Sequence, residues 1–126
     1  MKDYTDLAGR VLLALLFLLA GIGKLGEAYA GTQGYMEAFG VPGMLLPLVI
    51  LVEAGGALLL IVGYQTRWAA LALAGFSILS AAIFHSDFGD QAQMTNFLKN
   101  LSIAGGLLLL YANGPGSYSL DNRKKA

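Results

Sequence analysis

Four stretches of this chain are long enough and apolar enough to constrain its fold before any other feature is considered. They cover about residues 7–26, 44–63, 68–85 and 95–112. Crossing the hydrocarbon core of a bilayer takes about 20 mainly apolar residues, so each stretch reaches or approaches the required length. A segment alone in lipid must satisfy its own backbone hydrogen bonds, which a helix does. The sequence therefore predicts an all-α integral membrane protein with four transmembrane helices.

The composition agrees with lipid as the main solvent. The 126 residues are 56% hydrophobic and 13% charged, whereas soluble domains carry about 25% charged residues. We expect one domain over residues 1–126 with the bilayer as its surroundings. The formal net charge is zero, so nothing indicates nucleic acid as a partner. The sequence has no cysteine, which excludes disulfides, iron–sulfur ligation and thiol catalysis.

The distribution of lysine and arginine predicts that both termini are cytoplasmic, because cytoplasmic loops of membrane proteins carry more of these residues. With the N-terminus inside, the other side carries only Lys24 and Lys99. The cytoplasmic side then carries all the rest: Lys2, Arg10, Arg67, Arg123, Lys124 and Lys125. We therefore expect a multi-pass protein of the bacterial inner membrane.

The connections between the stretches are short, except for one. Residues 63–67 read as a tight turn and 86–93 as a short polar loop, whereas 27–43 is longer and could place a short helix, 35–39, on the membrane surface. Residues 28–30 have the small-x-small form of a signal-peptide cleavage site. Acidic residues offset the basic ones before it, so we expect the first span to be retained.

Each predicted span has one helical face that gathers its small and polar residues, and such faces pack together in membranes. Turning the four faces inward gives a four-helix bundle with a polar interior. A short motif, Ala-Gly-Gly, recurs at 54–56 and 104–106. It indicates either two similar hairpins, related by an axis along the membrane normal, or a coincidence in a glycine-rich chain.

The carboxylate of Glu53 lies near the middle of the second span, where a charge costs about 2.5–3.5 kcal/mol on insertion scales. It must pair with a cation or stay protonated. We expect Glu53 to pair with Lys99, with Lys24 or His85 in support, and Arg10 as a more distant candidate. Asn100 makes the surroundings of Lys99 polar. The alternative for each cation is snorkelling to the nearest interface.

The only histidine, His85, ends the third span on the outer side. Its side chain titrates near neutral pH, which suits a proton relay or a ligand contact, but a residue that caps a helix end is an equal alternative. No metal site is expected, because there is no second histidine and no evident third ligand. No cofactor motif is evident either. A redox role would therefore need a diffusible carrier, such as a quinone, or a partner subunit.

The ordered set of these features resembles the DoxX family of small bacterial four-helix membrane proteins, over about residues 7–121. Arg10 is followed by Gly21-x-x-Lys24, then by Glu53-x-Gly-Gly, and later by Lys99-Asn100 and by Gly-Pro-Gly at 114–116. The resemblance implies an inner-membrane location. It also implies quinone-linked redox chemistry as a role and Arg10, Lys24, Glu53 and Lys99 as the matching site positions.

Three functions fit these observations. The first is a quinone-linked redox component with a polar pocket in the outer half of the bundle, working with a membrane or redox protein partner. The second is a structural or assembly subunit of a membrane complex. The third is small-molecule transport by a homo-oligomer, since four helices are few for a carrier. Whether the chain is an enzyme stays open at this point.

Overall fold

The computed structural model describes residues 2–84 and 89–122, and every regular element in this part of the chain is a helix. In chain order these are α1 (Lys2–Gly23), α2 (Ala28–Ala38), the 3₁₀ turn η1 (Gly43–Leu45), α3 (Leu46–Ile50), the π-helical stretch η2 (Leu51–Gly55), α4 (Gly56–Val62), α5 (Thr66–Phe84) and α6 (Gln91–Asn113). The elements from η1 to α4 follow one another without a break and form one rod. The short surface helix predicted at 35–39 is the end of α2.

Three of the four predicted spans are confirmed as helices that are long and apolar enough to cross a membrane. Within the described ranges these are Lys2–Gly23, Gly43–Val62 and Thr66–Phe84. The fourth, α6, has 23 residues and is long enough. Its first half, however, carries polar residues, among them Asn96, Lys99 and Asn100. The all-α fold is thus confirmed, and α6 differs from the other spans in polarity rather than in length.

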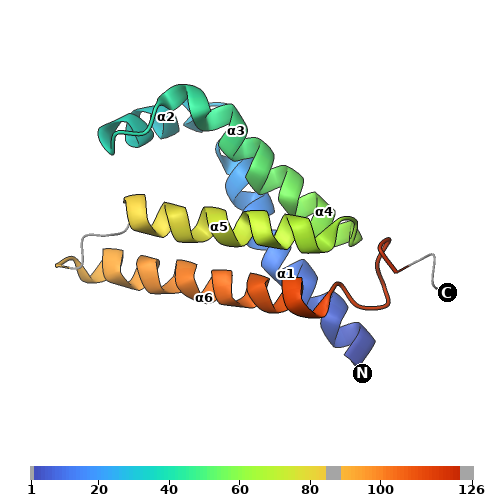
Figure 1. Cartoon of the computed structure of the whole chain (residues 1–126). Coiled ribbons are helices and arrows are strands. Elements are labelled where there is room, and N and C mark those ends of the chain that lie inside the picture. Colours follow the sequence, from blue (N-terminus) through green and yellow to red (C-terminus); the bar gives the residue numbers. More distant parts are fainter. Residues whose placement is uncertain (1, 85–88, 123–126) are drawn as a thin grey trace.

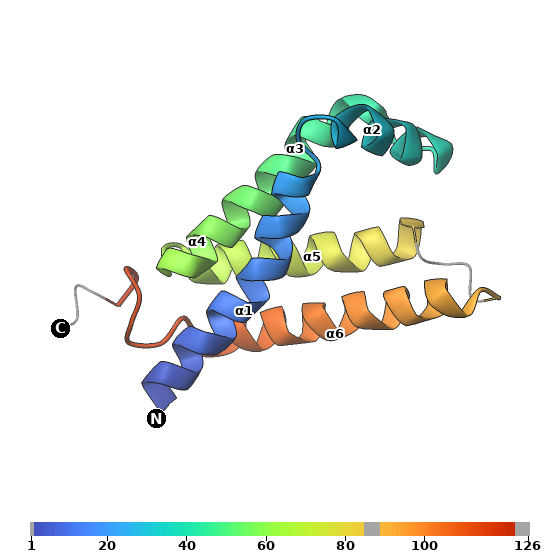
Figure 2. The same ribbon diagram turned by 180° about the vertical axis from the view of Figure 1, so that it is seen from behind.

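The helices form two antiparallel pairs. One pair is α1 with the rod that contains η2 and α4, and the other is α5 with α6 (Figures 1 and 2). The pairs meet at the end that holds both termini and separate toward the end that holds α2 (Figure 1). The predicted closed four-helix bundle is therefore not confirmed. The part of α1 that leads toward α2 packs against η2 instead of α6, which leaves α6 partly uncovered.

The two pairs repeat one packing pattern. The buried residues of α1 have the same spacing as four that are buried on α5: Arg10, Ala14, Phe17 and Gly21 correspond to Ala70, Ala74, Ser77 and Ala81. Both faces gather small or polar residues, as the sequence analysis expects of inward faces. On α6 the buried residues are Ala104 and Leu107, whereas the polar face that carries Lys99, Ile103 and Gly106, expected to turn inward, is not buried.

In each helix pair, the second glycine of the Ala-Gly-Gly motif packs against a leucine of the other helix pair. A Cβ atom on Gly56 would lie 3.1 Å from Cγ of Leu73 on α5. A Cβ atom on Gly106 would lie 3.4 Å from Cδ2 of Leu13 on α1. Leu13 and Leu73 hold the same position in their respective stripes, each directly before a buried alanine. Because each helix pair contributes both a glycine and a leucine to these equivalent contacts, the structure favours two similar hairpins over a chance recurrence of the motif.

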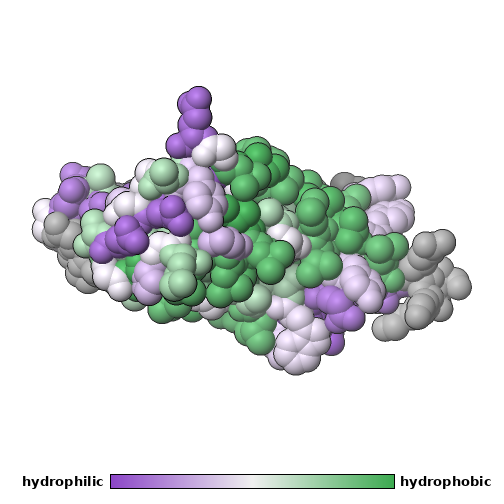
Figure 3. All heavy atoms as spheres, turned by 90° about the horizontal axis from the view of Figure 1, so that it is seen from above, coloured by the Kyte–Doolittle hydropathy of each residue, from purple (hydrophilic) through white to green (hydrophobic). Residues whose placement is uncertain are grey.

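Apolar side chains cover much of the surface. In the view from above, green apolar residues cross the middle of the visible face, while hydrophilic residues gather toward its ends (Figure 3). Large residues such as Leu12, Leu51 and Leu109 are more than half exposed. Lipid is the environment in which this much apolar surface is stable.

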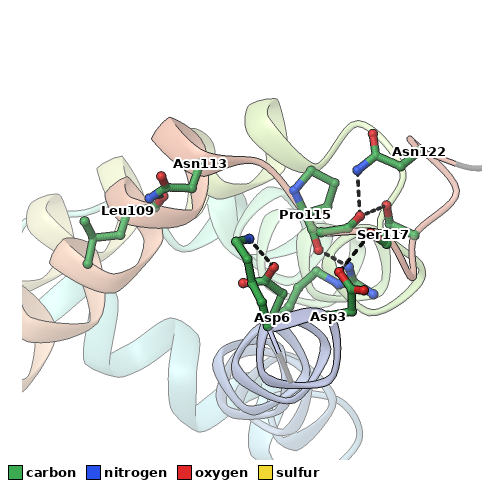
Figure 4. Close-up of polar contacts among 11 residues, drawn as sticks. Asp3, Asp6, Leu109, Asn113, Pro115, Ser117 and Asn122 are labelled. Atoms are coloured by element: carbon green, nitrogen blue, oxygen red, sulfur yellow. Dashed lines mark hydrogen bonds and ion pairs between the residues drawn. The ribbon is translucent and has the colours of Figure 1, made fainter. Parts of the chain in front are cut away.

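The segment after α6 folds back over the end of the molecule that holds the N-terminus. Gly114 and Gly116 have φ angles of +81° and +87°, which turn the chain sharply. The buried guanidinium of Arg10 donates to the carbonyl oxygens of Pro115 and Tyr118, at 2.5 and 2.7 Å. Figure 4 shows this segment beside the start of α1, where Ser117 donates to Asp3. Residues 114–122 therefore act as a clasp, and we use that name below.

Asp121 ties the clasp to the turn between α4 and α5. Its two carboxylate oxygens accept hydrogen bonds from the backbone N–H groups of Gln65 and Thr66, at 2.8 and 2.9 Å. Partial burial acts to raise the pKa of Asp121, but these N–H groups and the positive charge of Arg10 outweigh it, so the pKa lies below its ordinary value. The carboxylate thus caps the N-terminus of α5 from 55 residues away in sequence.

Replacing Asp121 with asparagine is expected to loosen the clasp, because lost helix caps cost about 0.5–2 kcal/mol. A lowered pKa in the folded state means that this stabilisation is present above the ordinary aspartate pKa, about 3.9, and is lost as the pH falls through the folded value. Limited proteolysis in detergent measures how well residues 114–122 are protected, and so how tightly the clasp is held. Wild-type protection should fall in acid, whereas Asp121→Asn should start low and change little with pH.

The matched control is Asp90→Asn. The Asp90 carboxylate caps α6 by accepting a hydrogen bond from the backbone N–H of Ala92, far from the clasp. Protection of the clasp should be the same in this variant as in the wild type. Equal proteolysis of Asp121→Asn and wild type at neutral pH would contradict the assignment.

Candidate functional site

Glu53 lies on the single π-helical stretch among the described residues, η2. A π-helical turn inserts into an α-helix at a local cost, and such turns are frequent at functional sites. The residue is 4% exposed. The turn thus presents a carboxylate from inside an apolar rod that is otherwise a continuous membrane helix.

The partner of Glu53 is Lys24, just after the end of α1. Nζ of Lys24 lies 2.6 Å from Oε1 of Glu53 and also donates to the carbonyl oxygen of Ala20 at 3.3 Å. Gly21 makes this pairing geometrically feasible. A Cβ atom there would lie 3.0 Å from the backbone nitrogen of Ala54 and 3.3 Å from Cβ of Glu53. The absence of a side chain therefore lets α1 approach η2 closely enough for Lys24, three residues on, to reach the carboxylate.

The predicted pair of Glu53 with Lys99 is wrong. Lys99 is exposed on α6, and the ion pairs between described residues are Lys2–Asp6 and Lys24–Glu53. The prediction assumed that α1 and α6 close around a common interior. Because the two helix pairs separate, Glu53 faces α1 and α5, and α6 is not its neighbour.

The remaining predicted residues do not join this ion pair. Arg10 holds the clasp at the opposite end of α1, with the buried residues Ala14 and Phe17 in between. Asn100 donates to the backbone oxygen of Ser77 at 3.3 Å and so connects α6 to α5. His85 lies outside the described residues.

A cavity of about 350 Å³ lies beside the Lys24–Glu53 pair, between α2, the rod and α5. This is within the usual range of ligand pockets, about 300–1,000 Å³. Its walls are largely apolar and include Val52, Phe76 and Leu79. Its polar lining groups are few: Lys24, Glu53, Thr32, Ser80 and the hydroxyl-bearing Tyr35. An apolar chamber with one charged pair suits a molecule with an apolar body and a polar head.

Helix α2 covers the outer side of this cavity. Tyr35 and Met36 of α2 contribute to its lining. Three rings form a cluster there, from α2, from the residue that follows it and from the end of α5. The ring centroids of Tyr35 and Phe84 are 5.3 Å apart, those of Tyr35 and Phe39 4.9 Å, and those of Phe39 and Phe84 5.2 Å. Such aromatic pairs contribute about 0.5–1.5 kcal/mol each beyond their buried area. The cluster thus fastens α2 to the end of α5.

Sequence reasoning missed Thr32, Tyr35 and Ser80 as members of the site. For Ser80 a signal existed: it is one helical turn from Ser77 in a stretch that is otherwise apolar or glycine from Trp68 to Phe84. For Thr32 and Tyr35 no sequence signal was available, because their place depends on how the long connection folds over the rod.

Comparison with known proteins agrees with these features. A family model described as DoxX matches residues 5–86. The chain is 52% identical over 121 residues to the inner membrane protein YqjF of Escherichia coli K12, covering 96% of this chain and 92% of that protein. It is 37% identical over 124 residues to the inner membrane protein YphA of the same organism, covering 93% and 88%.

The chain is also similar to part of a longer protein. The chain is 31% identical over 134 aligned positions to a Surfeit locus protein 4 homolog of Schizosaccharomyces pombe, covering 98% of this chain but 39% of that protein. No solved structure matches significantly.

The helices and their apolar surface define a multi-pass helical protein of the inner membrane. The chain belongs to the DoxX family. The resemblance drawn from the order of Arg10, Lys24, Glu53 and Lys99-Asn100 is thereby confirmed at the level of the family.

Substitution of Gly21 by alanine is expected to destabilise the protein, because the added methyl group meets the backbone of Ala54. Overpacking of this kind costs about 1–3 kcal/mol. Gly23→Ala is the matched control, since a Cβ atom at Gly23 has nothing within 4 Å. Thermal unfolding in detergent micelles, followed by circular dichroism, compares the two. Equal melting temperatures would show that α1 and η2 are not closely packed at Gly21.

The two members of the ion pair should differ in the effect of their removal. Lys24→Met leaves a buried carboxylate without its partner, and breaking a buried pair costs about 3–5 kcal/mol. Glu53→Gln should cost less, because the Lys24 side chain is 26% exposed and can turn toward water. The double variant should be more stable than Lys24→Met alone.

The same unfolding measurement tests this order of stabilities. Lys99→Met serves as the control, since it removes an exposed lysine from outside the pair. If Lys99→Met destabilised the protein as much as Lys24→Met, the assignment of the partner would be wrong.

Proposed function

We propose that this protein binds a small lipophilic molecule with a polar head in the cavity beside Lys24 and Glu53, and that a quinone is the chemical class it takes. The observation that carries the proposal is an apolar chamber of about 350 Å³ with a single ion pair in its wall. The apolar walls suit a ring and a short hydrocarbon tail. The polar groups suit carbonyl oxygens at the ring.

Lys24 is the residue that would hold the head of the ligand. An ammonium group has three N–H donors. Two of them go to Glu53 and to the carbonyl oxygen of Ala20, which leaves one for a ligand oxygen. The hydroxyl of Ser80 can donate from the opposite wall. In a quinone-linked reaction Glu53 would take or give the accompanying proton, and electrons would pass to or from a partner protein.

The topology that we infer has α6 as the fourth span and both termini in the cytoplasm. Four crossings return the chain to the side on which it starts. The hydrogen bond from Ser117 to Asp3, which joins the first turn of α1 to the clasp, supports a shared side for the two ends of the chain. The cavity then lies in the outer half of the membrane.

The other two functions are less well supported. A purely structural or assembly subunit needs no cavity of ligand size, and one is present. Transport through one subunit needs a polar route from Glu53 toward the cytoplasm. The core residues Phe17, Ala57 and Leu60 fill that direction instead.

The proposal predicts saturable binding of a tritiated short-chain ubiquinone to the purified protein in nanodiscs. Ser80→Leu fills part of the cavity without touching the ion pair, so it should weaken binding about tenfold, which is about 1.4 kcal/mol. Ser102→Leu, on the exposed face of α6, is the control and should bind as the wild type does. Non-saturable binding, or equal affinity of Ser80→Leu and wild type, would overturn the proposal. Quinone-dependent turnover, measured separately, distinguishes a redox component from a binding protein.

A further inference from the structure

Lys99 is a charged residue that the fold leaves uncovered on α6. It is exposed, as are its neighbours Thr95 and Ser102, and these three residues line a shallow hollow of about 400 Å³. Neither of the two ion pairs between described residues includes Lys99. The hollow thus presents one cation and two hydroxyl groups to whatever lies beside α6.

The depth of Lys99 follows from the hydrogen bond of its neighbour. Asn100 donates to the backbone oxygen of Ser77, which lies near the middle of α5. Since α5 is long and apolar enough to cross the membrane, the bond places Lys99 well inside the hydrocarbon region. A lysine there is costly unless it finds a partner or water.

The exposure of Lys99 results from the separation of the helix pairs. Lys99, Ile103 and Gly106 share one stripe of α6, and Gly106 faces Leu13 of α1. Beyond that contact α1 leaves α6, as Figure 2 shows. The cleft between the two helices, about 530 Å³, lies mostly on the other side of that contact, toward the termini, where Leu12, Leu109 and Asn113 are among its lining residues. Ile103 lines both the cleft and the hollow, so the two adjoin.

We propose that the cleft between α1 and α6 docks a transmembrane helix of another protein, which carries a carboxylate level with Lys99. Residues on the two walls recur at spacings of three and four: Gly9, Leu12 and Leu16 on α1, and Lys99, Ser102, Gly106 and Leu109 on α6. All of these are exposed except Gly106, which is half-buried. Spacings of three and four are those by which helices pack side by side. The small residues Gly9 and Gly106 allow close approach.

The charge of Lys99 distinguishes this occupant from two others. A second copy would have to supply a carboxylate at the same depth, and among the described residues Glu53 is the one at that depth, already paired with Lys24. A phospholipid fills the apolar part equally well, but its phosphate lies outside the hydrocarbon. A foreign helix with an aspartate or glutamate near its middle satisfies both the apolar walls and the cation.

The test uses the full-length protein in phosphatidylcholine vesicles and two dye-labelled model peptides. Both are leucine-rich 20-residue helices that differ only in one central residue, glutamate or glutamine. Energy transfer measures their association with the protein. The glutamate peptide should bind about five- to tenfold more tightly, the size expected for a polar contact between membrane helices. This preference should vanish in Lys99→Gln and persist in Lys99→Arg.

Cross-linking locates the bound peptide, because the sequence has no cysteine and a single introduced one reacts alone. Leu16→Cys in the cleft should form a disulfide with a cysteine in the glutamate peptide, whereas the exposed Leu58→Cys on α4 should not. Any of four results would overturn the proposal. These are equal binding of the two peptides, a preference kept in Lys99→Gln, disulfides between two copies at Leu16→Cys, or loss of the preference when phosphatidylglycerol is added, which would identify an anionic lipid as the occupant.

Discussion

A carboxylate in the middle of a membrane helix must be neutralised locally, and the Lys24–Glu53 pair does this with help from the backbone of both helices. Gly21 removes the side chain that would keep α1 away from η2, and the π-helical turn directs Glu53 toward the resulting contact. This contact holds the end of α1 against η2 rather than against α6, and the cavity under α2 lies beside the same ion pair.

Much of the fold could be predicted from the sequence, because membrane helices must satisfy their backbone groups within each segment. The helical elements, the buried faces of α1 and α5, and the importance of Glu53 and Lys24 all followed from local pattern. The partner of Glu53 did not. Lys99 and Lys24 are both close to Glu53 in depth, and depth alone does not reveal which helix lies beside which. Gly21 allows α1 to approach η2 closely, but one glycine in a chain with 17 of them does not by itself predict which helix packs against it.

The repeated hairpin pattern relates two helix pairs that pack alike but differ in what covers them. The two halves keep the same buried stripes and the same exchange of a leucine for a glycine. They differ in what lies over their helices: α2 covers the cavity of the first half, whereas Lys99 and its neighbours on α6 are exposed. The same packing pattern thus encloses a cavity in one half and leaves a helix face open in the other.

The clasp has a consequence for the order in which the chain folds. Arg10 enters the membrane with the first helix, but its acceptors at Pro115 and Tyr118 are 105 and 108 residues further along. At ribosomal speeds of about 5–20 residues per second, the guanidinium waits about 5–20 s for them. During that interval water or lipid headgroups at the membrane interface must solvate it. The end of the molecule that holds the clasp can thus close only after synthesis has reached residues 114–122, while the Lys24–Glu53 contact can form as soon as the second span is inserted.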